Sequence, residues 1–128
     1  MNGFVISAAD RPGLAADLFE ATARRGVNVF PAYGLADGPT GLICVGSDDE
    51  SGLQAASADA GLSATTVELV ETVIDNQPGT GATLFRRLAD EGVNLLVAVP
   101  VGMDEGLVRI ALGATDPDAL RRAIGDVA

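Results

Sequence analysis

Apolar residues recur with helical spacing in two stretches of the chain, and each stretch begins with a Pro-Gly pair. After Pro12, apolar positions follow at intervals of one, three and four residues: Leu14, Ala15, Leu18, Phe19 and Ala23. This spacing predicts an amphipathic helix whose apolar face, Phe19 included, packs into a core. Gly26 is placed to end the helix in a left-handed cap. A second helix, Pro78–Glu91, has the same pattern, and Phe85 is its expected core residue.

Shorter apolar runs between the helices predict strands. They lie at Phe4–Ala8, Val27–Leu35 and Leu42–Val45, and again at Val93–Val101 and Leu107–Leu112. Turn residues at Asp37–Pro39 and Gly102–Gly106 separate the paired runs. Pro31 and Pro100 fall inside the second strand of each set. Because proline cannot donate to a ladder, these strands are expected to be edges or to bulge there.

Two further helices are predicted from their starts. Asp48 or Asp49 is placed to cap a helix that carries Leu53, Ala56 and Ala60 and stops at Gly61. Thr115–Asp118 resembles a capping box with proline in the first turn, and it opens a helix to about Ile124. Between these regions, Leu62–Ile74 is a β-prone stretch without a turn signal.

The two halves of the chain are copies of one unit. Residues 12–28 align with residues 78–94 at an offset of 66, and nine of the seventeen aligned positions are identical. After a one-residue slip the offset becomes 67, which aligns Ile43 with Ile110 and Leu53 with Leu120. We therefore predict two domains, residues 1–68 and 69–128, built on one unit with the order strand, helix, strand, strand, helix, strand.

This order and its motifs resemble the ACT domain. The resemblance rests on Asp10-Arg11-Pro12-Gly13-Leu14 with Gly26-Val27-Asn28-Val29, and on Asn76-Gln77-Pro78-Gly79 with Gly92-Val93-Asn94-Leu95. It implies an α+β fold of two ferredoxin-like βαββαβ repeats, with antiparallel sheets that carry helices on one face. The chain departs from the family after Ile124, where residues 125–128 are too short for a fourth strand. Either Leu62–Ile74 serves both repeats, or one sheet edge is left open for a partner chain.

The resemblance also implies a regulatory module that binds a small molecule, most often an amino acid, at the strand-to-helix loops. In these loops Gly13 and Gly79 permit close backbone approach, and the N–H groups of a helix start attract a carboxylate. Asp10 can hold an ammonium group and Arg11 a carboxylate, whereas Asn76 and Gln77 offer uncharged hydrogen bonds only. The two loops are therefore not expected to be equivalent sites.

The candidate ligand contacts are Asp10, Arg11, Pro12, Gly13, Leu14 and Asn28 in the first repeat, and Asn76, Gln77, Pro78, Gly79, Thr80 and Asn94 in the second. A second interpretation remains open for each of them. A Pro-Gly pair is often simply a good helix start, and an asparagine after a helix-ending glycine often serves the backbone.

Composition narrows the chemistry. The 128 residues include 18 acids and 8 bases, a net charge of −10, and no histidine. All the bases are arginine. This balance disfavours nucleic acid and anionic membranes as partners, and the lack of histidine and lysine removes the usual general base and amine nucleophile. The single cysteine, Cys44, lies in an apolar run, so a buried structural thiol is favoured and neither a disulfide nor a metal site is expected.

Three functions are compatible with these observations. The favoured one is a cytoplasmic regulatory protein that binds an amino acid, needs no cofactor, forms a homodimer and acts through a regulated enzyme or another protein partner. The alternative is an interaction module of the same fold that binds no metabolite. An enzyme is disfavoured, because the usual sets of nucleophile and base cannot be assembled from these residues.

Overall fold

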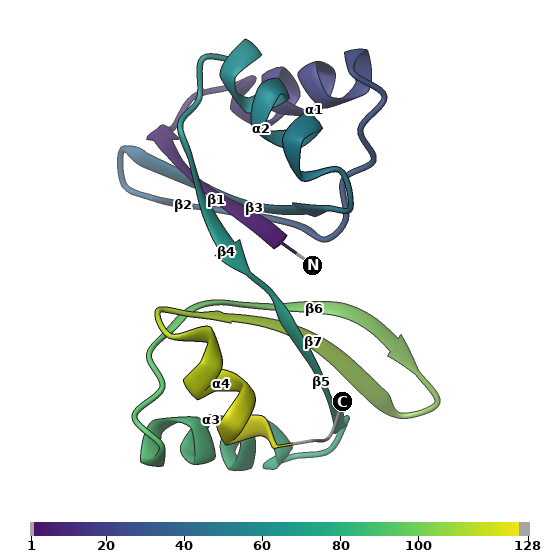
Figure 1. Ribbon diagram of the computed structural model, residues 1–128, viewed down its shortest axis with the longest axis vertical. Helices are drawn as coiled ribbons and strands as arrows, with labels where there is room; N and C mark the ends of the chain where they lie inside the picture. Colours follow the sequence, from purple (N-terminus) through teal and green to yellow (C-terminus); the bar gives the residue numbers. More distant parts are fainter. Residues whose placement is uncertain (1, 126–128) are drawn as a thin grey trace. The chain divides into compact units, whose positions relative to one another are not determined.

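The computed structural model describes residues 2–125 and divides the chain into two compact units, residues 1–67 and 68–128. The first unit has the order β1 (Asn2–Ala9), α1 (Leu14–Arg24), β2 (Ala32–Asp37), β3 (Thr40–Ser47), α2 (Glu50–Asp59) and β4 (Ala64–Glu68). Its strands form one sheet in the order β2-β3-β1-β4. Both helices cover the same face of that sheet (Figure 1). This is the predicted βαββαβ unit.

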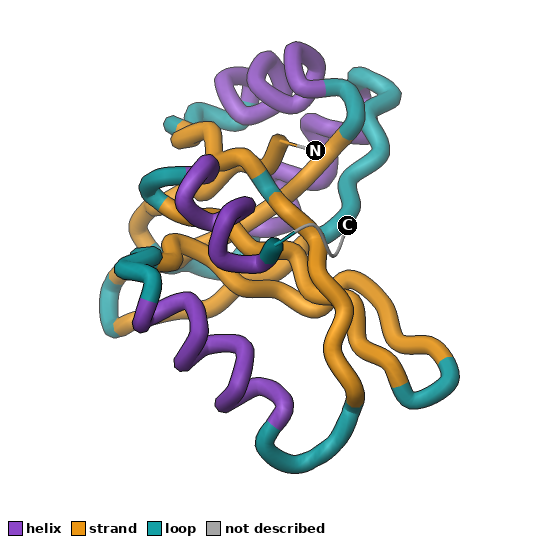
Figure 2. The backbone as a smooth tube through the Cα atoms, turned by 60° about the horizontal axis from the view of Figure 1, so that its bottom comes forward, coloured by secondary structure: helices purple, strands orange, loops and turns teal. Residues whose placement is uncertain are grey.

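Within residues 2–125, the second unit repeats this arrangement with one strand fewer. Its elements are β5 (Val70–Asp75), α3 (Thr80–Asp90), β6 (Leu95–Asp104), β7 (Leu107–Ala114) and α4 (Pro117–Ile124). The strands are antiparallel and follow the order β5-β7-β6. Short loops join strand to helix in both units (Figure 2).

The stretch Leu62–Ile74 supplies a strand to each sheet. It is divided at Leu69 into β4, which lies beside β1, and β5, which begins the second sheet. Within residues 2–125, no strand lies on the outer side of β5, at the position that β4 occupies beside β1. Both alternatives drawn from the sequence are therefore true of residues 2–125. The stretch supplies a strand to each unit, and the second sheet still has an open edge at β5.

Local signals fixed the helix ends as expected. Gly26 and Gly92 follow α1 and α3 with φ of 67° and 71°, in the left-handed region that glycine adopts without strain. The Asp49 side chain accepts a hydrogen bond from the Gly52 N–H at 2.9 Å, and the Asp116 side chain accepts one from the Ala119 N–H at 3.1 Å. Both aspartates are the N-caps of their helices.

Each unit has its own core between sheet and helices. The fully buried side chains of the first core come from all its layers: Phe4, Ile6, Leu18, Val45 and Leu53. Those of the second core are Leu88, Leu112 and Leu120. Leu53 and Leu120 are equivalent in the sequence alignment, and both are fully buried in the core of their unit.

The prediction that Phe19 and Phe85 are core residues is wrong. Their relative exposures are 39% and 41%. On α1 the buried residues are Leu14, Leu18, Ala21 and Thr22, and Phe19 lies about 100° around the helix from Leu18. The helix carries apolar residues on two sides, and the spacing of apolar residues in the sequence assigned both sides to a single buried face.

The second strand of each unit also begins later than predicted. β2 starts at Ala32 rather than Val27, so Pro31 precedes the strand; the segment before it is still tied to β3, since the Phe30 N–H donates to the Gly46 carbonyl at 2.9 Å. β6 starts at Leu95 and contains Pro100, which stands on an edge strand next to a register shift. The expectation of an edge or a bulge at Pro100 is confirmed. No helix of the described chain is long and apolar enough to cross a membrane.

Candidate ligand site

Helices α1 and α3 begin without a side-chain cap. Gly13 and Gly79 are their N-cap residues, with φ of 90° and 92°, and neither makes a side-chain capping hydrogen bond. Helices α2 and α4, in contrast, are capped by aspartate side chains. Because no side chain of the N-cap residue occupies the first-turn N–H groups of α1 and α3, these donors can bind an external anion such as a carboxylate.

The start of α1 borders a cavity of about 290 Å³ within the first unit. Its other wall is the hairpin of β2 and β3. Gly34 lies opposite Ile43, and Ala36 lies opposite Gly41; directly opposed residues share a face of the sheet. Ile43 belongs to the core, so this row faces the helices. The cavity exists because three positions of that row carry at most a methyl group.

Charged and polar groups of the β1–α1 loop stand at its mouth. Asp10, Arg11, Gly13 and Leu14 all line the cavity, so four of the six first-repeat candidates come together here. The Asp10 N–H donates to the Pro39 carbonyl at 2.9 Å, which ties the loop to the β2–β3 turn. Among residues 2–125, no ion pair engages the Asp10 carboxylate. This carboxylate is exposed and available to a cation.

Arg11 is held by the first turn of α1. Its Nη2 donates to the Asp17 carboxylate at 2.6 Å and its Nη1 donates to the Pro12 carbonyl at 3.3 Å. The guanidinium is therefore already paired, and it does not offer an isolated charge to a ligand. The donors best placed for an anion are the backbone N–H groups of Ala15 and Ala16, two cavity-lining residues in the uncapped first turn.

The second loop has different surroundings. Thr80 borders a cavity of about 360 Å³ between β5 and the helices α3 and α4, and the other second-repeat candidates are not among the residues that line this cavity. The Thr80 hydroxyl donates to the Gln77 carbonyl at 3.0 Å, and the Asn76 N–H donates to the Gly106 carbonyl at 2.8 Å. These bonds close the loop on itself and on the β6–β7 turn.

The two asparagines lie away from these loops. The Asn28 carbonyl accepts a hydrogen bond from the Ser47 hydroxyl at 2.8 Å, and Asn28 borders a separate cavity with Asp48 and Asp49. The Asn94 carbonyl accepts one from the Thr115 N–H at 3.2 Å. In both units the asparagine lies between the helix and the next strand, and it is not among the residues that line the cavity beside the Pro-Gly loop.

The wall made by Gly34, Ala36 and Gly41 was not identified from the sequence. The available signal was a row of small residues at alternate positions of a hairpin, where a half-buried strand usually carries larger side chains. The remaining reactive candidate, Cys44, is buried, and burial raises the pKa of its thiol. No group of three or more metal-ligating side chains exists among the described residues.

Comparison with known proteins shows the fold. No protein-family model and no curated protein sequence matches the chain. Among solved structures, protein BT0572 from Bacteroides thetaiotaomicron superposes with a TM-score of 0.77 at 16% identity, over 95% of this chain and 84% of that one. The regulatory subunit of aspartate kinase from Thermus thermophilus, in its ligand-free form, superposes with a TM-score of 0.67 at 22% identity, over 98% of this chain and 90% of that one.

The corresponding subunit from Thermus flavus gives a TM-score of 0.68 at 23% identity, over 96% of this chain and 89% of that one. The chain has the tandem ACT fold. The match spans nearly the whole of both chains, so both repeats share in it. At these identities the likeness concerns the fold, and the ligand has to be argued from the residues of this chain.

Proposed function

We propose that the protein is a regulatory protein that binds a small amino acid in the cavity of the first unit. The observation that carries the proposal is the uncapped start of α1 at an open cavity beside an exposed carboxylate. An amino acid presents two opposite charges and one side chain. The ligand carboxylate accepts from the N–H groups of Ala15 and Ala16, and its ammonium group pairs with Asp10.

The ligand side chain packs between Leu14 and the hairpin. Ile43 supplies apolar contact there, and the small residues of the same row, Gly34, Ala36 and Gly41, leave room for an aliphatic group. Support for a regulatory role comes from the aspartate kinase subunits that share the fold and from the lack of histidine and lysine. With no assembled catalytic set, the bound state acts on a partner protein.

The test combines ligand screening with a filled cavity. We expect a thermal-shift screen of the common amino acids to raise the melting temperature with at least one of them, by mass action on the folded state. The amide of that amino acid, which lacks the carboxylate, is expected to give no shift. Asp10→Asn is expected to weaken binding about tenfold, because the ammonium group loses its charged partner.

Gly34→Leu is the sharpest variant. A Cβ at Gly34 meets only the Leu42 carbonyl oxygen, at an ordinary 3.5 Å, so the strand accepts the side chain while the cavity is filled. Ala32→Leu on the same exposed strand is the matched control, since Ala32 is outside the cavity lining. Binding lost in the first variant and kept in the second supports the site. Binding that survives in both places the ligand elsewhere.

The second candidate function is an interaction module without a metabolite. The observation in its favour is the set of exposed large apolar side chains, which includes Phe19 and Phe85 on the helices. Failure of every common amino acid to stabilise the wild-type protein at millimolar concentration favours this module over the sensor.

A further inference from the structure

Helix α3 carries polar residues at two positions that helix α1, its repeat-related helix, uses for the core of the first unit. Leu14 and Ala21 of α1 are buried. At the repeat offset of 66 they correspond to Thr80 and Arg87 of α3. Thr80 is half-buried and Arg87 is exposed. The side of α3 that matches the core side of α1 therefore carries two polar groups.

Strand β5 shows the same change. Ile6 of β1 is fully buried and lies opposite Ile43, whereas Thr72 of β5 lies opposite Ile110, the repeat-related residue of Ile43. Thr72 therefore occupies the position of Ile6, and it is only 8% exposed. None of the side-chain hydrogen bonds seen within residues 2–125 engages its hydroxyl, so this group is available to bond a ligand in the space that it lines.

These three polar residues line one cavity of about 360 Å³ in the second unit. It lies between β5 and the helices α3 and α4, which cover one face of the second sheet (Figure 1). Its apolar lining consists of Ile74, Leu84, Leu107 and Ile124. In the first unit the matching side of β1 is covered by β4, which buries Val67 in the core. In the part of the second unit that the structure describes, no strand covers β5 in this way, and the cavity is open there.

The cavity offers a positive charge and no carboxylate to balance a second one. Among the described residues, no carboxylate forms an ion pair with Arg87. Asp75 also lines the cavity. Its side chain is turned to the other face of the sheet, because successive residues of a strand alternate and its neighbour Ile74 packs against the core. What Asp75 gives to the cavity wall is its carbonyl, which accepts from the Thr80 hydroxyl at 2.5 Å.

We propose that this cavity binds a small aliphatic carboxylate, a ligand without an ammonium group. The carboxylate pairs with Arg87 and accepts from the Thr72 hydroxyl, and the hydrocarbon part packs on Leu84 and Ile124. Ligand pockets usually have volumes of about 300–1,000 Å³, so a cavity near the lower limit fits a ligand with a short chain. Residues 76–79 do not line the cavity. The site is therefore separate from both Pro-Gly loops, and this proposal and the amino-acid site of the first unit can fail independently.

A titration of the full chain with pentanoate, followed by NMR at the backbone amides, tests the site. We expect pentanoate to shift amide signals of β5 and α3 and to leave those of α1 unchanged, because a ligand without an ammonium group has no charge to pair with Asp10. Pentanamide has the same shape but no charge, and it is expected to bind about tenfold more weakly. Acetate is too short to cover Leu84 and Ile124, and it is expected to bind at least about fivefold more weakly.

Two neighbouring arginines of α3 provide a matched pair of variants. Arg87→Gln is expected to weaken pentanoate binding about tenfold. Arg86→Gln removes the same charge from the same helix at a residue outside the cavity lining, and it is expected to leave binding unchanged. Thr72→Ile introduces the residue of the first unit. It is expected to abolish binding by filling the cavity and to raise the melting temperature of the free protein, because an apolar side chain replaces a hydroxyl without a partner.

Circular dichroism of each variant confirms folding. Equal binding by the two arginine variants would show that Arg87 does not hold the carboxylate, and this overturns the proposal. Pentanamide that binds as tightly as pentanoate also overturns it, as do shifts confined to the first unit. If an amino acid stabilises the protein while pentanoate does not bind, the amino-acid site of the first unit is supported and the site in the second unit is disproved.

Discussion

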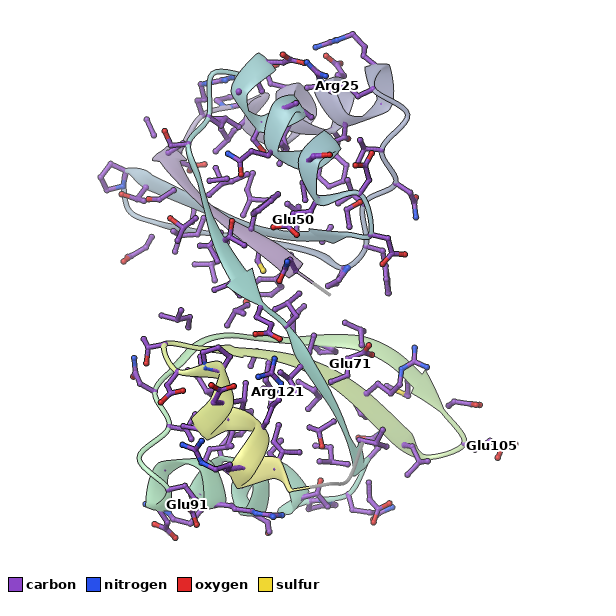
Figure 3. The ribbon with its side chains drawn as sticks, in the orientation of Figure 1. Arg25, Glu50, Glu71, Glu91, Glu105 and Arg121 are labelled. Carbon is purple, nitrogen blue, oxygen red and sulfur yellow. The ribbon has the colours of Figure 1, made fainter. Side chains whose placement is uncertain are left out.

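Arg25 and Asp59 join the end of α1 to the end of α2. The guanidinium donates twice to the carboxylate, from Nε at 2.6 Å and from Nη2 at 3.1 Å, and Arg25 projects from the helical layer of its unit (Figure 3). The hydrogen bond from Arg25 lowers the pKa of Asp59. A carboxylate whose pKa is lowered by folding stabilises the fold above its unfolded pKa, and this contribution is lost as the pH falls through the folded pKa.

Arg25→Gln is therefore expected to raise the pKa of Asp59. It is also expected to reduce the part of the fall in unfolding free energy at acid pH that comes from this ion pair. Carboxyl-carbon NMR titration measures the change directly. Arg87→Gln, an exposed change in the other unit, is the control and is expected to leave the pKa of Asp59 where it was. An Asp59 titration unaffected by Arg25→Gln would contradict the assignment. Because both side chains are 44% exposed, the effect on the unfolding free energy is small.

Residue roles set by near neighbours in the chain could be read from the sequence. The caps at Asp49 and Asp116 and the left-handed glycines after α1 and α3 depend on a few consecutive residues. Phe19 could not be placed in this way. Its helix has two apolar sides, and only the position of the sheet decides which of them is buried.

The β5 strand makes a prediction at the scale of one element. The Asn76 N–H donates to Gly106, its opposite residue in the antiparallel register with β7. Hydrogen-bonded pairs alternate along such a ladder, so Thr72 and Ile74 bond to β7 while the N–H groups of Glu71, Val73 and Asp75 point to the open edge. We expect the amides of Thr72 and Ile74 to exchange with solvent at least about tenfold more slowly than that of Val73.

Hydrogen exchange followed by NMR at single amides tests this alternation. In β1 of the first unit, strands lie on both sides, so consecutive central amides such as Val5 and Ile6 are expected to be protected alike and serve as the control. Protection of Val73 equal to that of Thr72 would show a strand seated on the edge of β5. The alternation follows from the register, so it holds whether or not a ligand is bound.

The order of the elements could be predicted, but the wall of the cavity could not. Pro-Gly starts, glycine ends and apolar runs predicted the strand–helix order of both units within residues 2–125. The cavity depends on Gly34 and Gly41 facing the helices, and this requires the register Gly34–Ile43 and Ala36–Gly41. A shift of one residue would turn the same side chains to the other face, and the sequence alone did not fix that register.

For the whole molecule, net charge and ion pairing act in opposite directions on stability. The chain carries a net charge of −10, which destabilises a compact state through self-repulsion. The ion pairs seen among the described residues have side chains that are at least 40% exposed, and pairs of this kind contribute about 0–1 kcal/mol each. We therefore expect repulsion to exceed the attraction of the pairs.

Screening should then stabilise the fold. Raising sodium chloride from about 10 mM to about 500 mM shortens the Debye length from roughly 30 Å to about 4 Å, so the long-range repulsion between acids is removed. We expect the melting temperature, followed by circular dichroism, to rise by a few degrees at a protein concentration low enough to keep the chain monomeric. Tetramethylammonium chloride, whose cation coordinates carboxylates poorly, should give the same rise if screening is the cause. A melting temperature that falls with either salt would mean that the ion pairs outweigh the net charge, and that the acidic surface is not what limits the stability of this protein.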